Sequence, residues 1–264
     1  MLKELLTRFE SRKVKDYYAR KHDEYLKYMG DIFQAYRMPQ DDDFLDYYIK
    51  AMKLKDGMRL LDAGCGVCGP ASYFASKLDV AIEAITISPE QQATAKEKLA
   101  NMKLKGQVYP SVHDFHFIDK KFSEEEFDVI YFLESFVHSA YPDQVMAGAQ
   151  KCLKRNGMIY IKDFFHGVAT DKDERDHLNY AVKQCNKVTS LTVRHLDETL
   201  NTLRKNNLKV ISASMLPFMP DYEKGNTFYA NTGAEIYKDQ KGKYNGIGPE
   251  YLIFYEIIAI KPFH

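Results

Sequence analysis

Short apolar runs alternate along the chain with segments in which apolar residues recur at helical spacing. The runs have the length of buried strands, and most are separated by enough chain for a crossover helix, which is typical of a parallel sheet. Strands are predicted at residues 60–62, 80–87, 107–113, 127–133, 158–163, 208–215 and 251–260. Helices are predicted at residues 89–101, 143–153 and 196–205, and a turn at residues 154–157. We therefore predict an α/β fold with a doubly wound, mostly parallel seven-stranded sheet.

Two regions fall outside this alternation. Residues 1–50 have a helical pattern rich in tyrosine, and residues 217–249 form a long stretch rich in glycine, asparagine and tyrosine. Ligands of open α/β sheets bind at the carboxyl ends of the strands, so both regions are candidates for covering a site there, although each tyrosine could simply pack. We predict an N-terminal helical cap at residues 1–50 and a ligand-binding domain at residues 51–264, with cap insertions near residues 164–190 and 217–250.

An acid and three glycines mark the end of the first predicted strand, where Asp62 is followed by Gly64, Gly66 and Gly69. Glycine adopts backbone angles that other residues avoid, and it lets a ligand approach the backbone just before a helix. In the dinucleotide fingerprint the acid follows the loop by about 20 residues. Here the acid precedes the first glycine, which makes NAD the weaker alternative for a nucleotide cofactor.

Composition limits the partners and the compartment. Among 264 residues, 37 are Lys or Arg and 37 are Asp or Glu, so the chain has no net field to attract DNA or tRNA. No apolar run reaches the roughly 18 residues of a membrane-spanning helix. Cys65 and Cys68 lack a second pair at metal-ligand spacing, which favours reduced thiols in a turn over a zinc or redox pair. We expect a cytoplasmic protein without a transmembrane segment or a nucleic-acid partner.

The acid–glycine loop resembles the cofactor loop of class I S-adenosylmethionine-dependent methyltransferases. The following segment, Ile85-Thr86-Ile87-Ser88-Pro89-Glu90-Gln91, is similar to one shared by cyclopropane fatty acid synthases, sterol C-methyltransferases and geranyl diphosphate C-methyltransferases. The resemblance implies a Rossmann-like methyltransferase fold with S-adenosyl-L-methionine as cofactor. It also implies that Asp62, Gly64 and Gly66 form the cofactor loop.

Three further cofactor contacts follow from the same resemblance. Thr86 and Gln91 are expected at the ribose, although Ser88 and Gln91 also have the spacing of a helix-capping box. Asp114 is expected to accept from the adenine amino group, with Phe115 against the ring. The alternative for Asp114 is a turn or N-cap role.

The segment from Phe127 to His138 resembles the fourth strand and following turn of the sterol and prenyl diphosphate C-methyltransferases, in which a Glu-x-x-x-His pattern faces the transferred methyl group. An alkene that takes a methyl group becomes a tertiary carbocation and must then lose a proton. A carboxylate can stabilise this cation and act as the base, and aromatic rings add cation–π attraction. We predict Glu134 and His138 as catalytic residues, with Glu134 also close to the cofactor; the alternative is that Glu134 caps or orients the turn and His138 is a surface histidine with satisfied hydrogen bonds.

The tyrosine-rich N-terminus resembles, loosely, the aromatic region that closes over cofactor and substrate in the same group, which implies cofactor contacts for Tyr17 and Tyr25. The chain has no tryptophan and so lacks the aromatic-glycine-tryptophan core of the sterol enzymes. It also has no clear match to the bicarbonate-binding residues of the cyclopropane synthases. An isoprenoid or related small molecule is therefore the expected methyl acceptor, with Mg²⁺ required if that acceptor is a diphosphate.

Three functions stay open from the sequence. The first is C-methylation of an isoprenoid alkene, and the second is N- or O-methylation of a small metabolite. The third is cofactor binding without catalysis, because a fold does not fix a function. A homo-oligomer is compatible with each of them.

Overall fold

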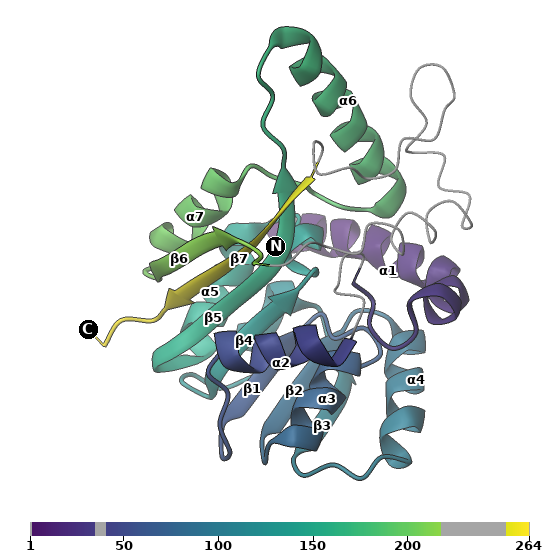
Figure 1. The fold of residues 1–264 in the computed structure, drawn as a ribbon, viewed down its shortest axis with the longest axis vertical. Coiled ribbons are helices and arrows are strands. Elements are labelled where there is room, and N and C mark those ends of the chain that lie inside the picture. Colours follow the sequence, from purple (N-terminus) through teal and green to yellow (C-terminus); the bar gives the residue numbers. More distant parts are fainter. Residues whose placement is uncertain (1, 35–40, 218–251, 264) are drawn as a thin grey trace.

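The computed structural model describes residues 2–34, 41–217 and 252–263. These ranges contain a seven-stranded sheet of order β3-β2-β1-β4-β5-β7-β6 (Figure 1). Its strands are β1 (Arg59–Ala63), β2 (Ala81–Thr86), β3 (Gln107–Val112), β4 (Phe127–Leu133), β5 (Leu153–His166), β6 (Lys209–Met215) and β7 (Leu252–Ile260). Neighbouring strands from β3 to β5 are parallel, and β7 runs antiparallel to both β5 and β6. The predicted mostly parallel, seven-stranded sheet is confirmed.

Helices cover both faces of the sheet. One layer holds α2 (Asp41–Ala51), α3 (Gly69–Lys77) and α4 (Pro89–Ala100), and the other holds α5 (Pro142–Cys152), α7 (Leu196–Lys205) and the 3₁₀ helix η1 (Phe115–Lys120). Leu60 and Leu61 are adjacent on β1 and fully buried, but they belong to different layers because side chains alternate across a strand. The covered faces leave the carboxyl ends of the strands for ligand binding.

A third apolar cluster lies beyond the two layers. It joins α1 (Leu2–Met29), α6 (Lys172–Thr189) and the 3₁₀ turn η2 (Phe136–His138). Tyr17 and Tyr25 of α1 are buried in it together with Leu178 of α6 and Phe254 of β7. Figure 1 shows α1 and α6 at the end of the sheet where β5 leads into α6. These two helices therefore lie on the side where the sequence predicts a cofactor.

Several boundaries differ from the sequence prediction. The turn predicted at residues 154–157 is an irregularity inside β5, where the pairing with β4 shifts register and Asn156 adopts φ 60°. Helix α6 was not predicted as a helix, and Tyr251 and most of residues 217–250 lie outside the described residues. Helix α2 packs on the sheet, with Phe44 and Tyr48 fully buried, so the end of the 1–50 segment contributes to a sheet layer.

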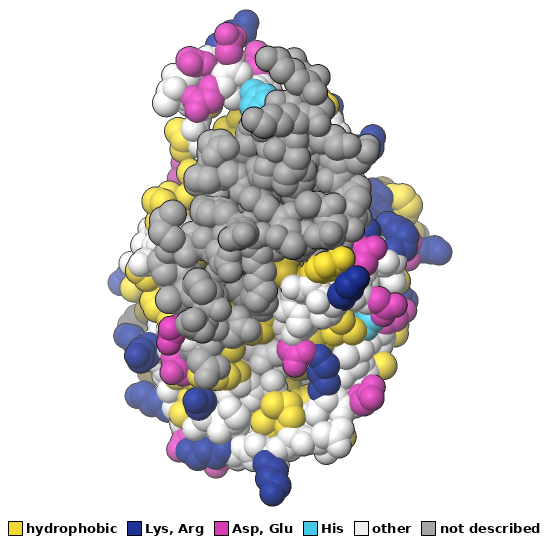
Figure 2. All heavy atoms as spheres, turned by 45° about the vertical axis from the view of Figure 1, so that its right-hand side comes forward, with side chains coloured by type: hydrophobic (Ala, Val, Ile, Leu, Met, Phe, Trp, Pro, Cys, Tyr) yellow, Lys and Arg dark blue, Asp and Glu magenta, His cyan; other side chains and the backbone are white. Residues whose placement is uncertain are grey.

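The visible surface mixes the two signs of charge. Figure 2 shows basic and acidic side chains interspersed around the described part of this face, as the equal counts of the sequence suggest. Among the helices of the described ranges, none combines the length and the apolar character needed to cross a bilayer.

Candidate active site

The glycine loop after β1 forms one wall of a pocket at the carboxyl edge of the sheet. Gly64 and Gly66 have φ of 107° and 54°, in the region that favours glycine. A Cβ atom added to Gly64 would lie 2.4 Å from the Cβ of Ser135, and one added to Gly66 would lie 3.4 Å from the ring of Phe33. The loop is held to the sheet because the backbone N–H groups of Gly64 and Cys65 both donate to the carbonyl of Ile85 at 2.9 Å.

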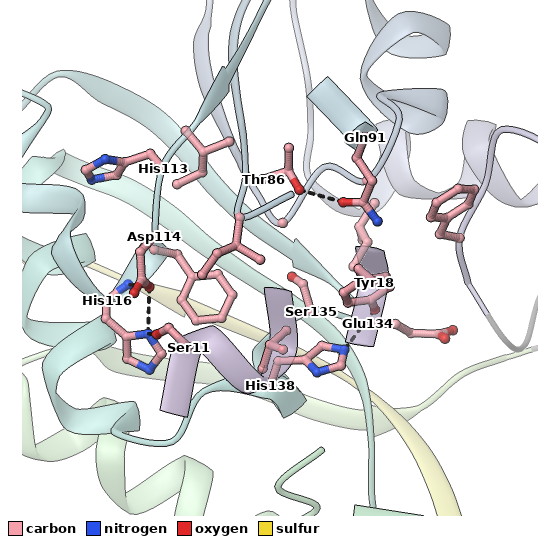
Figure 3. A pocket seen from close by; sticks show the side chains of 18 residues that line it. Ser11, Tyr18, Thr86, Gln91, His113, Asp114, His116, Glu134, Ser135 and His138 are labelled. Atoms are coloured by element: carbon pink, nitrogen blue, oxygen red, sulfur yellow. Dashed lines mark hydrogen bonds and ion pairs between the residues drawn. The ribbon is translucent and has the colours of Figure 1, made fainter. Parts of the chain in front are cut away.

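The pocket has about 620 Å³ of non-protein space, part of it open to solvent. It brings together eight of the predicted site residues: Gly64, Gly66, Thr86, Gln91, Asp114, Phe115, Glu134 and His138. These residues lie at or shortly after the carboxyl ends of β1, β2, β3 and β4, as expected for a parallel sheet. Figure 3 shows Asp114 at one side of the pocket and Tyr18 with Glu134 at the other.

Asp62 does not line this pocket. It is 2% exposed on β1, and burial raises its pKa to about 8. The cofactor role expected of Asp62 therefore stays a prediction.

Thr86 and Gln91 meet at the end of β2. The Thr86 hydroxyl donates to Oε1 of Gln91 at 2.5 Å, and both residues are nearly fully buried on the pocket wall. Ser88 caps α4 by accepting from the Gln91 backbone N–H at 3.2 Å, as predicted. The expected capping box is wrong in its second half, because the Ser88 N–H donates to Thr86 Oγ1 and not to the Gln91 side chain. The Gln91 amide is therefore available to the pocket.

Asp114 follows β3, where it caps a helix and also lines the pocket. Its Oδ1 caps η1 by accepting from the His116 backbone N–H at 2.9 Å, and it also accepts from His116 Nδ1 at 2.7 Å. Burial raises the pKa of Asp114, but the hydrogen bonds and charge of His116, with Ser11, outweigh burial and hold it below its usual value. Asp114 is therefore an ionised acceptor on the pocket wall beside Phe115.

Glu134 directly follows β4 and has φ 55°, an uncommon backbone conformation for a side chain of this size. Its carboxylate forms an ion pair with Lys162 of β5, and the two side chains are 3% and 0% exposed. The Glu134 backbone N–H also donates to the Lys162 carbonyl at 2.7 Å. The sequence analysis missed Lys162, although a single cation within the apolar run of β5 was a usable signal.

His138 lies one turn further on and is neutral. Its Nδ1 lies 3.1 Å from the Ser190 carbonyl, which can only accept, so this nitrogen carries the proton. The other nitrogen, Nε2, therefore accepts from the Tyr18 hydroxyl at 2.9 Å. Burial lowers the pKa of His138 to about 4, which keeps the ring uncharged near neutral pH.

Helix α1 crosses the pocket, but it presents different residues from those predicted. Tyr17 and Tyr25 lie away from the pocket lining, and their hydroxyls contact each other at 3.2 Å. Ser11 and Tyr18 line the pocket from α1 instead. Helix α1 thus reaches the site, but the abundance of tyrosine in the sequence did not show which face of the helix lines the pocket.

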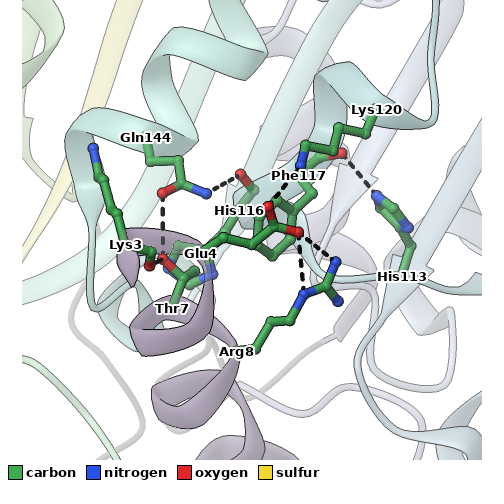
Figure 4. A network of polar contacts seen from close by, with 9 residues as sticks. All are labelled: Lys3, Glu4, Thr7, Arg8, His113, His116, Phe117, Lys120 and Gln144. Carbon is green, nitrogen blue, oxygen red and sulfur yellow. Dashed lines mark hydrogen bonds and ion pairs between the residues drawn. The ribbon is translucent and has the colours of Figure 1, made fainter. Parts of the chain in front are cut away.

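The first turns of α1 are fastened to η1 and α5 (Figure 4). Thr7 contacts the Gln144 side chain at 3.3 Å, and Gln144 donates to the His116 carbonyl at 3.0 Å. Glu4 pairs with Arg8 at 2.9 Å and with Lys120 of η1 at 3.3 Å. These contacts hold α1 beside the Asp114 side of the pocket.

The cysteines and acids show no metal centre in the described residues. Cys65, Cys68, Cys152 and Cys185 are buried and form no disulfide. Within the described ranges, no three His, Cys, Asp or Glu side chains are grouped so that they could hold a metal ion.

A seven-stranded sheet with this pocket at its carboxyl edge defines the class: the fold is that of the class I methyltransferases, as the sequence resemblance predicted. The family model of mycolic acid cyclopropane synthetases matches residues 12–229, and the chain belongs to this family.

Curated relatives point to the same class. Methyltransferase GfsG of Streptomyces halstedii is 26% identical over 157 residues, which are 59% of this chain and 54% of that protein. Sterol 24-C-methyltransferase erg6 of Aspergillus fumigatus is 27% identical over 168 residues, 61% of this chain and 44% of that protein. The chain thus spans about half the length of the curated relatives it matches.

Solved structures share the fold at low sequence identity. The [4+2]-cyclase SpnF has a TM-score of 0.74 at 18% identity, covering 96% of this chain and 97% of its own. Geranyl diphosphate C-methyltransferase of Streptomyces coelicolor A3(2), solved with Mg²⁺, geranyl diphosphate and S-adenosyl-L-homocysteine, has a TM-score of 0.67 at 15% identity, covering 84% and 79%. At these identities the likeness shows the fold alone.

Proposed function

We propose that this protein is an S-adenosylmethionine-dependent C-methyltransferase that acts on an alkene of an isoprenoid small molecule. The observation that carries the proposal is the buried carboxylate of Glu134, which shares one pocket with the cofactor-type residues Gly64, Thr86 and Asp114. The family match and the class of the curated relatives support the cofactor and the reaction type.

The residues of the pocket fit the cofactor. The cradle at Gly64 and Gly66 is one that a Cβ atom would fill or strain. The Gln91 amide can serve the ribose hydroxyls, and the ionised Asp114 can accept from an adenine amino group. When bound, S-adenosylmethionine supplies the electrophilic methyl group.

Glu134, His138 and Tyr18 define the methyl-acceptor side. An alkene that receives a methyl group develops positive charge on carbon, and a fixed carboxylate stabilises that charge better in a dry pocket than in water. Glu134 provides the carboxylate, and the Tyr18 ring adds a π face. Neutral His138 adds no positive charge that would oppose the developing cation.

The charge balance of this side favours a neutral acceptor. Lys162 compensates the charge of Glu134, so the pair presents no net negative charge to hold a cationic amine. A neutral alkene carries no charge that would have to be desolvated when it enters the pocket. This balance supports C-methylation over N-methylation of a cationic substrate.

The isoprenoid class is supported by the names of related proteins, which act on sterols or geranyl diphosphate. A diphosphate acceptor would add a need for Mg²⁺, which a magnesium titration during turnover tests.

Two measurements test the proposal. Calorimetry should detect binding of S-adenosylmethionine and S-adenosylhomocysteine but not of NAD. Mass spectrometry should then detect methylation among a panel of prenyl alcohols, prenyl diphosphates, amines and phenols. Methylation restricted to the amines or phenols would replace the proposal with N- or O-methylation, and cofactor binding without turnover on any acceptor would contradict it.

A further inference from the structure

A buried cation lies behind the catalytic side of the pocket, and neither the sequence motifs nor the family resemblance assigns it a role. Lys162 is fully buried on β5, in a strand whose neighbouring side chains are largely apolar. An ammonium group is rarely buried without compensating partners, because removing it from water costs free energy. The partners of Lys162 therefore indicate what it does.

Lys162 is held from three sides. Its Nζ donates to the Glu134 carboxylate and, at 3.1 Å, to Oε1 of Gln34. Gln34 is fixed in turn by the hydroxyl of Tyr48, which donates to the same oxygen at 3.1 Å. The ring of Phe254 lies 5.4 Å from Nζ. Contacts from the sheet and, through Gln34, from α2 thus fix the position of the ammonium group.

We propose that Lys162 is a positioning residue, which holds Glu134 ionised and oriented toward the methyl acceptor. This inference rests on the proposed function, because it concerns the same carboxylate. Lys162 does not line the pocket, so it acts through Glu134 and not on the substrate.

The physical basis is the cost of burying a carboxylate without the positive charge next to it. Without Lys162, Glu134 would remain 3% exposed but would lose the charge of this ion pair, which would make its protonated form more favourable than in the wild type. A protonated Glu134 can neither stabilise a cation nor accept a proton. Within residues 2–34, 41–217 and 252–263, other titratable groups that act on the pair are Asp163 on β5, Tyr18 on α1, Tyr48 on α2 and Glu256, the cross-strand partner of Lys162 on β7. These four groups are acids or phenols, and none of them carries a positive charge.

The test compares Lys162→Met, Glu134→Gln and the double variant with the wild type. In Lys162→Met, kcat should fall at least tenfold at pH 7 and recover partly as the pH rises and Glu134 ionises, with an unchanged KM for S-adenosylmethionine. Glu134→Gln should show no such recovery. Lys154→Met, which removes the partly exposed lysine paired with Asp128 at 2.8 Å, is the matched control and should keep the wild-type pH profile.

Unfolding supplies a readout that needs no substrate. The melting temperature of Lys162→Met should drop relative to the wild type as the pH rises from 6 to 8, because its folded state then has to release the proton from Glu134. The double variant should lose this extra pH dependence and melt closer to the wild type than Lys162→Met does.

The outcomes separate the two claims. Full activity of Glu134→Gln would contradict the proposed function itself. An inactive Glu134→Gln together with a wild-type rate and pH profile in Lys162→Met would leave the proposed function standing and overturn the role of Lys162. An unfolding curve of Lys162→Met with wild-type pH dependence would also overturn it.

Discussion

The hydroxyl of Tyr18, on α1, donates a 2.9 Å hydrogen bond to Nε2 of His138, on the turn after β4. His138 in turn donates from Nδ1 to the carbonyl of Ser190, at the end of α6. One imidazole therefore connects both helices of the outer apolar cluster to the strand end that carries Glu134. This arrangement suggests that release of ligand from the pocket requires α1 to move.

Replacing Tyr18 by phenylalanine removes this hydrogen bond while keeping the ring. We expect S-adenosylhomocysteine to dissociate about fivefold faster, since one net hydrogen bond is worth about 1 kcal/mol. Hydrogen exchange of α1 in the bound state should rise as well. Tyr17→Phe is the matched control, because Tyr17 lies outside the pocket lining and contacts Tyr25 instead. Equal dissociation rates in the two variants would contradict a gating role for Tyr18.

The buried neutral state of His138 predicts a pH dependence of stability. Its pKa is lowered to about 4 in the folded protein, against about 6.5 in the unfolded chain, so the unfolded state binds more protons between these values. The contribution of His138 to stability should therefore be complete above about pH 6.5 and decrease as the pH falls toward 4, by up to about 3 kcal/mol.

The measurement is chemical denaturation of wild type and His138→Gln from pH 4 to 8. The difference between the two free energies of unfolding should shrink toward low pH, because glutamine does not titrate. His177→Gln, on α6, controls for the loss of an imidazole. A difference that stays constant with pH would show that His138 is not buried in its neutral form.

Two variants after the end of β2 distinguish a residue that caps a helix from a residue that binds the cofactor. Ser88→Ala should lower the free energy of unfolding by about 1 kcal/mol by removing the cap of α4, with little change in cofactor affinity. Gln91→Leu should do the reverse, weakening S-adenosylhomocysteine binding with a smaller effect on stability. Calorimetry measures the affinity of both variants for S-adenosylhomocysteine, and denaturation measures their stability. If Gln91→Leu binds S-adenosylhomocysteine as tightly as the wild type does, Gln91 is not part of the cofactor site.

The prediction for the other cofactor contacts concerns the glycine loop and Asp114. Gly66→Val should abolish binding, because φ 54° disfavours a branched side chain and the added atoms would contact Phe33. Asp114→Ala should weaken S-adenosylhomocysteine binding by about 1 to 3 kcal/mol through loss of an ionised acceptor. Glu97→Ala, an exposed acid on α4, should bind like the wild type. Unchanged affinity in Gly66→Val and Asp114→Ala would contradict this cofactor site.

The parts that the sequence predicted well are those with local signals. The alternating apolar runs predicted all seven strands, and Ser88 and Pro89 predicted the start of α4. The turn predicted at residues 154–157 falls inside the bounds of β5, but it is present as an interruption of the pairing: Leu153 pairs with Phe127 and Met158 pairs with Val129, with residues 154–157 between them unpaired to β4. The positive φ of Asn156 accommodates this extra length of chain, and the strand resumes at Met158 by pairing with β4 and β7.

The parts that it missed depend on contacts distant in the sequence. Tyr18 rather than Tyr17 or Tyr25 reaches the pocket, which depends on how α1 is rotated against η1 and α5. Lys162 and Glu134 are 28 positions apart and meet only because β4 and β5 are neighbours in the sheet. Helix spacing and strand alternation contain no information about such pairings.

The most direct test of the central claim is the position of the transferred methyl group. The protein is incubated with S-adenosylmethionine carrying a trideuterated methyl group and with the acceptor panel, and the product is analysed by mass spectrometry and nuclear magnetic resonance. The account predicts the label on a former alkene carbon of an isoprenoid, at a rate reduced about 10² to 10⁴-fold in Glu134→Gln. Label found only on nitrogen or oxygen, or carbon methylation at the wild-type rate in Glu134→Gln, would contradict it.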